Sequence, residues 1–276
     1  GDVNPASGST VAPGASFGTL TITGDVAYAA TATNVFELRT STVVGSGSND
    51  LLVIDGNLDL GSSSIVIDTV ETLTGDAHYV LITYSGILTG TSTLITTGVG
   101  RKSYALDYGT AGEVRLAVTG ASQDLIWNPE DLADWDEVKS NWTNTAGALQ
   151  EAYQADDHVQ FTDLGGESNA VNLVGTLEPS LVTVNSTSNY TFSGSGKVSG
   201  YAAIVKTGAG SLSLDTGNDF TGGLTVQGGV VDGVAGGFGG DGAGVTVQNG
   251  GGVDLNAVDR SANRMDVTLS GTGASG

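Results

Sequence analysis

The chain has 276 residues, of which 39% are hydrophobic, and it has no cysteine, so disulfides, thiolate-bound zinc and cysteine catalysis are excluded. Thirty acidic residues against nine basic ones give a net charge of −21, which argues against binding to nucleic acid or to anionic lipid. No stretch of 18 apolar residues occurs, so no membrane-spanning helix is predicted.

Most apolar segments alternate Thr, Val, Ile or Leu with small polar residues, and Gly, Asn or Asp closes each run. This period of two, with turn residues between the runs, predicts short β-strands. The segments with this pattern are 18–24, 51–61, 64–70, 78–84, 113–120, 181–185, 189–196, 211–217, 224–229, 245–251 and 265–271. An all-β chain is therefore expected.

Similar short sequence segments recur in the C-terminal third of the chain. "LTVQGG" at 224–229 and "VTVQNGG" at 245–251 are offset by 21 residues, and "LVTVN" at 181–185 lies about two such offsets upstream. "YTFSG" at 190–194 recurs as "VTLSG" at 267–271. Periods of about 20–50 residues favour a repeat architecture, and short strands with single glycine corners suit a parallel β-solenoid with coils about 4.8 Å apart. An antiparallel sandwich is the alternative.

Residues 121–168 differ from their surroundings, because they hold all three tryptophans and a net charge of −10, against −7 for 1–120 and −4 for 169–276. We interpret them as an acidic junction between a strand-rich segment, 1–120, and a solenoid repeat unit, 169–276. The text "NPEDLADWDEVKSNW" predicts one short helix there, with a capped, acidic first turn and an apolar face. Its capping and first-turn residues are Asn128, Pro129, Glu130 and Asp131, its apolar face is Leu132, Trp135 and Val138, and Lys139 lies near its end. Trp127, Trp135 and Trp142 are expected to be buried around this helix, with stacking on sugars as the alternative.

Residues 202–231 closely resemble the autotransporter-associated β-strand repeat, and 242–271 echo it more weakly. The matching residues are Lys206, Gly208, Gly210, Leu212, Leu214, Asn218, Phe220, Gly222, Gly223, Val226 and Gly229. A valine, Val230 or Val231, stands where leucine is usual. The resemblance implies an extracellular right-handed β-solenoid, often the passenger of an autotransporter, with roles in surface display, adhesion or matrix. We expect the matching residues to be structural, with Lys206 bonding a corner carbonyl and Phe220 capping a ladder of side chains.

The flanking text also resembles this group of secreted repeat proteins. Residues 12–26 resemble the segment that closes a repeat unit, and the text from 135 to 165 resembles the start of a fresh one. We therefore expect the chain to be a window of a longer periodic protein, or a subunit whose ends continue into one another.

An enzyme on a β-helix needs convergent carboxylates, and Asp156-Asp157-His158 is the only dense group. Neighbouring residues of a strand point to opposite faces, so Asp156 and Asp157 would not share a site. His158 and the lone His78 are expected to be structural. No catalytic or cofactor-binding residue is predicted.

A calcium site is a weaker hypothesis. "GGFGGDGAG" at 236–244 matches the first six positions of the glycine-rich calcium nonapeptide, ending at Asp241, but it occurs once, whereas that motif works in tandem. Asp241, Asp156 and Asp157 are the calcium candidates, and no metal is assigned to them.

The sequence therefore predicts a non-enzymatic, secreted structural protein of a bacterial surface. Its expected partner is itself, since an open end of a solenoid templates another strand, and head-to-tail assembly would give a filament, fibre or stalk used in adhesion or matrix. A polysaccharide or a cell surface is a further expected partner. The alternatives are a monomeric passenger adhesin or carbohydrate-binding module, and a polysaccharide-degrading β-helix enzyme.

Overall fold

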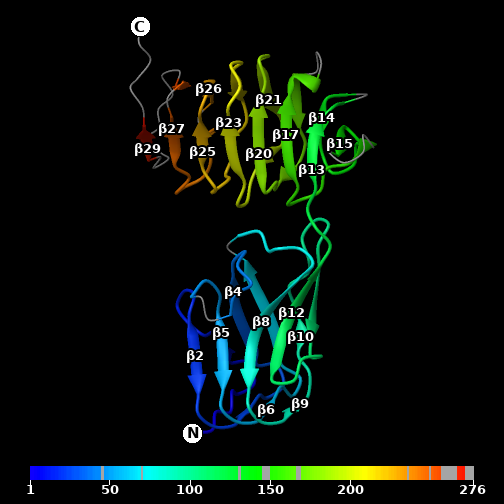
Figure 1. Cartoon of the computed structure of the whole chain (residues 1–276), viewed down its shortest axis with the longest axis vertical. Helices are drawn as coiled ribbons and strands as arrows, with labels where there is room; N and C mark the ends of the chain where they lie inside the picture. Colours follow the sequence, from blue (N-terminus) through cyan, green and yellow to red (C-terminus); the bar gives the residue numbers. More distant parts are fainter. Residues whose placement is uncertain are drawn as a thin grey trace. The chain divides into compact units, whose positions relative to one another are not determined.

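A computed structural model of the chain describes residues 1–44, 47–69, 71–129, 132–144, 150–165, 169–234, 236–248, 250–255 and 266–270. The fold is nearly all β, and most strand pairs are parallel (Figure 1). The chain divides into two compact units, Gly1–Ala121 (unit 1) and Ser122–Gly276 (unit 2). The predicted division into the segments 1–120, 121–168 and 169–276 rests on composition and on the sequence repeats, and it stays a prediction.

Unit 1 passes repeatedly through three sheets. A four-stranded sheet has the order β1-β4-β7-β10, a five-stranded sheet β11-β12-β8-β5-β2, and a three-stranded sheet β3-β6-β9. The strands are β1 (Thr10–Val11), β2 (Thr19–Ile22), β3 (Val26–Ala27), β4 (Thr33–Leu38), β5 (Leu51–Ile54), β6 (Leu58–Asp59), β7 (Ser64–Thr69), β8 (Ala77–Tyr84), β9 (Leu88–Thr89), β10 (Thr93–Leu94), β11 (Ser103–Asp107) and β12 (Glu113–Thr119). The order five-, three-, then four-stranded sheet is followed three times, by β2-β3-β4, β5-β6-β7 and β8-β9-β10.

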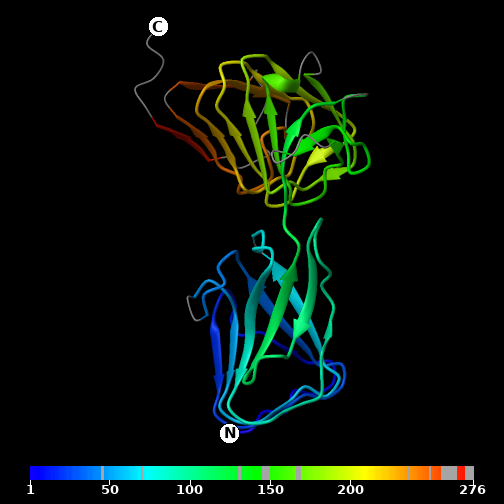
Figure 2. The same ribbon diagram turned by 45° about the vertical axis from the view of Figure 1, so that its right-hand side comes forward.

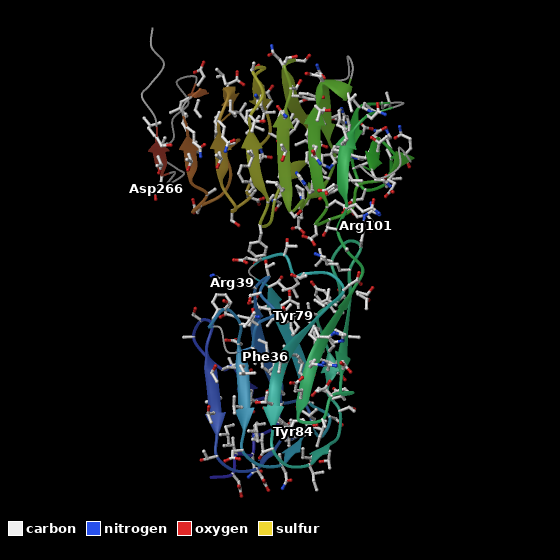
Figure 3. The ribbon with its side chains drawn as sticks, in the orientation of Figure 1. Phe36, Arg39, Tyr79, Tyr84, Arg101 and Asp266 are labelled. Atoms are coloured by element: carbon white, nitrogen blue, oxygen red, sulfur yellow. The ribbon has the colours of Figure 1, made fainter. Side chains whose placement is uncertain are left out.

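The core of unit 1 lies between these sheets. Alternate residues of β4 and β7 are buried, as period-two strands with one apolar face require. Phe36 and Tyr79, labelled in Figure 3, are among the largest fully buried side chains. The Tyr79 hydroxyl donates to the carbonyl oxygen of Thr40 at 3.0 Å and accepts from the backbone N–H of Thr74 at 2.7 Å, so its polar end is satisfied. At the surface, the Arg39 guanidinium lies 4.2 Å from the centre of the Phe17 ring.

Unit 2 has two long sheets and one short one. The nine-stranded sheet has the order β16-β15-β13-β17-β20-β23-β25-β27-β29, the six-stranded sheet β14-β18-β21-β24-β26-β28, and the two-stranded sheet β19-β22. The elements are β13 (Asp124–Trp127), β14 (Asp134–Trp135), β15 (Trp142–Asn144), β16 (Gln150–Glu151), β17 (His158–Thr162), η1 (Asp163–Gly165), β18 (Ala170–Leu173), β19 (Thr176–Leu177), β20 (Leu181–Asn185), β21 (Tyr190–Gly194), β22 (Lys197–Val198), β23 (Ala203–Lys206), β24 (Leu212–Leu214), β25 (Leu224–Val226), β26 (Gly229–Gly233), β27 (Val245–Val247), β28 (Gly251–Asp254) and β29 (Val267–Leu269).

From β17 onward the chain alternates between the two long sheets, and we call one strand of each, with its connections, a coil. Strands of successive coils lie side by side in Figure 1, and Figure 2 shows the chain passing round between the two faces. Partner residues in the nine-stranded sheet are 23 apart for His158↔Leu181 and 21 apart for Leu224↔Val245. The 21-residue offset of the two "TVQ" words is confirmed, since Thr225 pairs with Thr246.

The second sequence recurrence does not mark equivalent strands of two coils, so this expectation was wrong. "YTFSG" forms β21 of the six-stranded sheet, whereas the strand of "VTLSG", β29, belongs to the nine-stranded sheet. Both sheets present one apolar face inward and one polar face outward, so the same alternating word suits either of them.

The predicted helix at 128–142 was also wrong. Trp135 lies in β14 and pairs with Leu173 of β18, while Leu132 and Val138 of the expected apolar face are 64% and 83% exposed. Lys139 forms an ion pair with Asp134 instead of closing a helix. Burying one tryptophan in a sheet outweighs an amphipathic pattern whose other members find no core. Asn128 and Pro129 precede the gap at 130–131, and Glu130 and Asp131 lie outside the described residues. Within those residues the only helical segment is η1.

Each unit contains antiparallel strands that the sequence did not predict. In unit 1, β12 pairs antiparallel with β8, and β11 pairs antiparallel with β12. In unit 2, β15 pairs antiparallel with β13, and β16 pairs antiparallel with β15. At these places the parallel ladder ends, because the next strand runs the other way.

Candidate functional site

The repeat sequence of residues 206–229 occupies the middle of unit 2, from the end of β23 to the start of β26. Its alternate residues Leu212, Leu214, Leu224 and Val226 are all buried in one cluster with the apolar residues of the neighbouring coils. The side chains of this segment therefore fill the space between the two long sheets, and none of these four can do chemistry.

Two glycines of the repeat lie where the backbones of neighbouring coils meet. A Cβ on Gly208 would lie 2.2 Å from the carbonyl oxygen of Ser186, and one on Gly210 would lie 2.1 Å from that of Ser188. Such distances are far below van der Waals contact, so only glycine fits without moving the backbone. Gly222 and Gly229 also face backbone carbonyls of another segment, and Gly223 and Gly229 have positive φ angles, 88° and 68°.

Lys206 is fully buried. In the nine-stranded sheet it is paired with Val184 of the preceding coil and with Val226 of the next. Its Nζ donates to the carbonyl oxygen of Gly208 and, at 3.2 Å, to that of Gly228. The ammonium group thus joins two corners of the backbone one coil apart. Burial lowers the pKa of Lys206, because the charged form loses its hydration.

This lowered pKa predicts that Lys206 makes stability depend on alkaline pH. Between the lowered folded-state pKa and the unfolded value near 10.5, the unfolded chain binds more protons, so the free energy of unfolding should rise with pH. Lys206→Met should remove this rise. The measurement is urea unfolding at a series of alkaline pH values, followed by tryptophan fluorescence, which reports on unit 2 since all three tryptophans lie there.

The buried Tyr190 has a pKa raised to about 12 by burial, and it opposes this trend above pH 10. Its contribution is common to both proteins and cancels in the comparison. Equal pH profiles for the wild type and Lys206→Met would contradict the prediction.

Asn218 joins three coils. Its Oδ1 accepts from the backbone N–H of Val198 at 2.8 Å, and its Nδ2 donates to the carbonyl oxygen of Gly237 at 2.8 Å. It is 4% exposed, so each lost bond would leave a buried group unsatisfied. Phe220, two residues on, is fully buried in the same core.

An aromatic cluster fills the unit 2 core around β13 to β18. Trp142 lies 4.9 Å from Trp127, 5.5 Å from Trp135 and 5.4 Å from Phe161, measured between ring centres. All three tryptophans are fully buried, which confirms the predicted burial, although strands and not a helix hold them. None of them is free to stack on a sugar.

The two candidate aspartates at 156 and 157 lie in a turn before β17. Asp156 has φ 72°, and its Oδ2 accepts from the Ser122 hydroxyl at 2.9 Å. Asp157 is fully buried and accepts from the backbone N–H groups of Gln123 and Gln154, at 2.8 and 2.9 Å. Both carboxylates have close structural partners that hold this turn.

The other candidate residues lie apart from these aspartates. Asp241 is exposed in the turn between β26 and β27. His158 lies on β17, with Nδ1 2.7 Å from Asp124 Oδ1 and Nε2 2.9 Å from Thr183 Oγ1, and so it links three neighbouring strands. His78 lies 3.5 Å from Asp107 Oδ2. Within the described residues, no three carboxylate or histidine side chains gather where they could hold a metal ion.

Sequence reasoning missed Asp163, at the start of η1. Its carboxylate accepts from the Ser186 hydroxyl, from the backbone N–H of Thr187 at 2.8 Å and from the Thr187 hydroxyl at 3.2 Å. These bonds, the one from Ser186 first, lower the pKa of Asp163. It is therefore a clamp between the coil of β17 and the next.

The Asp163 clamp should lose its effect in acid. Its stabilisation is complete above the unfolded-state pKa near 3.9 and is lost as pH falls through the lower folded-state pKa. The free energy of unfolding should therefore fall more steeply below about pH 4 in the wild type than in Asp163→Asn. Urea titrations at matched acidic pH values measure this difference, and parallel curves would refute it.

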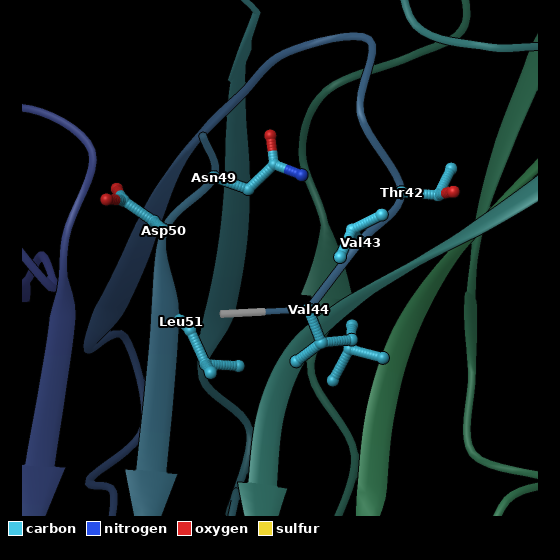
Figure 4. A pocket seen from close by; sticks show the side chains of 7 residues that line it. Thr42, Val43, Val44, Asn49, Asp50 and Leu51 are labelled. Atoms are coloured by element: carbon cyan, nitrogen blue, oxygen red, sulfur yellow. The ribbon is translucent and has the colours of Figure 1, made fainter. Parts of the chain in front are cut away.

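Unit 1 has a small hollow beside β5. Thr42, Val43, Val44, Asn49, Asp50, Leu51 and Val80 line it (Figure 4). The Asp50 carboxylate already accepts from the backbone N–H groups of Gly18 and Glu37, both at 2.9 Å. The polar wall of the hollow is thus engaged in holding strands together.

Comparison with known proteins agrees with this geometry. Residues 204–232 match the family described as the passenger-associated-transport-repeat. The chain is 30% identical, over 268 residues, to the adhesin BmaC autotransporter of Brucella suis biovar 1 (strain 1330), and this match covers 80% of the chain and 8% of that adhesin. No solved structure matches. The chain is an autotransporter passenger-type repeat protein.

Proposed function

We propose that this chain is a segment of a secreted bacterial surface protein, that it forms right-handed parallel β-solenoids, and that it acts in adhesion without turnover. The observation that carries the proposal is the unbroken parallel ladder from β13 through β29, built by glycine corners and apolar alternation. The similarity to an adhesin supports it. No helix in the described residues is long and apolar enough to cross a membrane.

The solenoid explains why the repeat contains so few reactive groups. In each coil the inward positions pack, the corners turn, and the outward positions face solvent. A solenoid of this kind carries an extended regular surface, which suits binding through many weak contacts. Among the described residues no three carboxylates or histidines gather where they could hold a metal ion, and the carboxylates of Asp156 and Asp157 hold a turn, which gives no support to a hydrolase.

The test is surface display. Bacteria that display residues 1–276 should adhere more to host-cell or matrix-coated surfaces than bacteria that display a variant with a broken core, such as Trp135→Ala. Both strains must show equal amounts of displayed protein. Equal adherence of the two strains would refute an adhesive role for the folded chain.

Head-to-tail assembly is the second proposal. β29 lies at the edge of the nine-stranded sheet in the described part of the chain, and its Val267 and Leu269 are 47% and 77% exposed. An edge strand of this kind pairs readily with another strand, so we propose that a second copy extends the sheet there. Sedimentation velocity and electron microscopy should show concentration-dependent filaments. A monodisperse monomer at high concentration would refute assembly.

A further inference from the structure

The outward face of the nine-stranded sheet is uncharged along most of its length. The outward strand positions from β20 to β29 are Leu181, Thr183, Asn185, Ala203, Val205, Thr225, Thr246 and Thr268. No acidic or basic residue is among them, although the chain carries 30 acidic and nine basic residues. We call this surface the neutral face.

The neutral face is ordered in rows. Thr183, Val205, Thr225, Thr246 and Thr268 are paired in register across five strands, so they form one row along the stack. A second row of amides and hydroxyls follows at the strand ends. Its members are Asn185, at the end of β20, and the residues just past the next four strands, Thr207, Gln227, Gln248 and Ser270, whose backbone N–H groups each donate to the preceding strand of the sheet. Strands of a sheet lie about 4.8 Å apart, so each row repeats at that spacing.

The hydrogen-bonding groups of these rows are largely unused. Within the described residues, the side chains of Thr225, Gln227, Thr246 and Gln248 make no hydrogen bond, and both glutamines are exposed. Their donors and acceptors are therefore available to a partner. The charged groups on this sheet stand at its two ends: Asp124 contacts His158 at one end, and the exposed Asp266 directly precedes β29 at the other.

The six-stranded sheet provides the contrast. Asp232 and Asp254 are direct neighbours on its outward side, and Asp215 follows the outward Ser213 of β24. The two outward faces of unit 2 thus differ in charge while sharing the same strand geometry. Selection for solubility alone would favour acidic residues on both faces.

We propose that the neutral face binds an uncharged linear polysaccharide that lies along the stack of coils. A face without cations gives a polyanion nothing to pair with, and the net charge of −21 repels it. From β20 to β27 the face has no carboxylate to ligate a cation, and it has no aromatic residue to anchor a protein interface. Rows of hydroxyls and amides match the hydroxyls of a neutral sugar chain, and small apolar residues such as Ala203 and Val205 match its C–H faces.

This proposal rests on the proposed adhesive function, because it names the class of ligand for that role. Each coil adds the same weak contact, so a polymer that spans several coils gains avidity without a deep pocket.

The test is affinity electrophoresis of the full chain in native gels that contain hydroxyethylcellulose or dextran, with alginate as the polyanionic control. Retardation is expected in a neutral glycan and not in alginate. The double substitution T225E/T246E places two carboxylates on neighbouring strands of the neutral face and should weaken binding about tenfold or more. T225V/T246V keeps the side-chain shape, removes both hydroxyls and should weaken binding in the same direction.

The matched control is T191E/S213E, which adds the same charge at paired outward positions of the six-stranded sheet. It should leave retardation unchanged, and urea unfolding should show that all variants are folded. The proposal is overturned if no neutral glycan retards the wild type, or if both glutamate pairs reduce retardation equally. It is also overturned if T225E/T246E abolishes self-association in sedimentation while glycan retardation persists, since the face would then bind a second copy. Adherence that survives T225E/T246E would overturn this inference and leave the adhesive function standing.

Discussion

Trp135→Ala should destabilise unit 2 by about 3–5 kcal/mol, the range found when a large buried aromatic residue is truncated. Trp135 is fully buried and lies within 6 Å of four of its aromatic neighbours, among them Phe161 at 5.4 Å and Phe192 at 5.8 Å between ring centres. Its removal leaves a cavity that several rigid rings cannot refill. Urea unfolding, followed by the fluorescence of the two remaining tryptophans, measures the loss.

Val138→Ala is the matched control for this prediction. Val138 lies three residues further on, in the same segment, but it is 83% exposed, so the change in the free energy of unfolding should be within about 0.5 kcal/mol of zero. A helix would make both residues part of one buried face, and both variants would then be destabilised. A small loss for Trp135→Ala, or a large one for Val138→Ala, would contradict the strand assignment.

Gly208→Ala should destabilise unit 2 by about 3 kcal/mol, at the upper end of the range for overpacking. The added Cβ would lie 2.2 Å from the carbonyl oxygen and 2.3 Å from the nitrogen of Ser186, and these are backbone atoms that cannot rotate away. Ser186 follows β20, which is paired along its length with β23, so a local shift would strain the ladder.

Gly217→Ala tests whether this cost comes from contact between coils. Gly217 lies in the same repeat, but a Cβ there would meet no atom within 4 Å, and its φ is not in the left-handed region. We expect Gly217→Ala to be neutral or slightly stabilising, because alanine restricts the unfolded chain more than glycine does. Similar losses for the two variants in urea unfolding would show that glycine flexibility, and not close approach, is what the repeat needs.

Much of the fold could be predicted from the sequence, since strand alternation depends on neighbouring residues alone. The pairing of Thr225 with Thr246 followed from the 21-residue offset of two matching words. The antiparallel strands β12 and β15 could not be predicted in this way, because alternation gives no strand direction. A signal for β12 did exist: two alternating runs, 103–107 and 113–119, flank a short loop with Gly109 and Gly112, which is typical of a hairpin.

The candidate site shows a similar limit. The identity of Lys206 suggested a bond to a corner carbonyl, yet its link to Gly228 depends on which residues the next coil brings close. Asp163 carried no motif, and its clamp on Ser186 and Thr187 needs the stacking of two coils. The neutral face can be recognised only when residues some 20 positions apart are aligned in register. Strand pairing in the structure gives this alignment, and the amino-acid sequence alone does not.

The number of residues in a coil also determines how much extended chain the stack contains for each unit of its height. A coil of 20 to 22 residues, as between Ile204, Leu224, Val245 and Val267, holds roughly 65–80 Å of extended chain. In the stack it occupies only about 4.8 Å of height. A surface protein built in this way, when pulled by a tethered cell, would lengthen by one coil at a time. Each released coil would become more than ten times longer along the direction of pull, while the coils that remain stay paired.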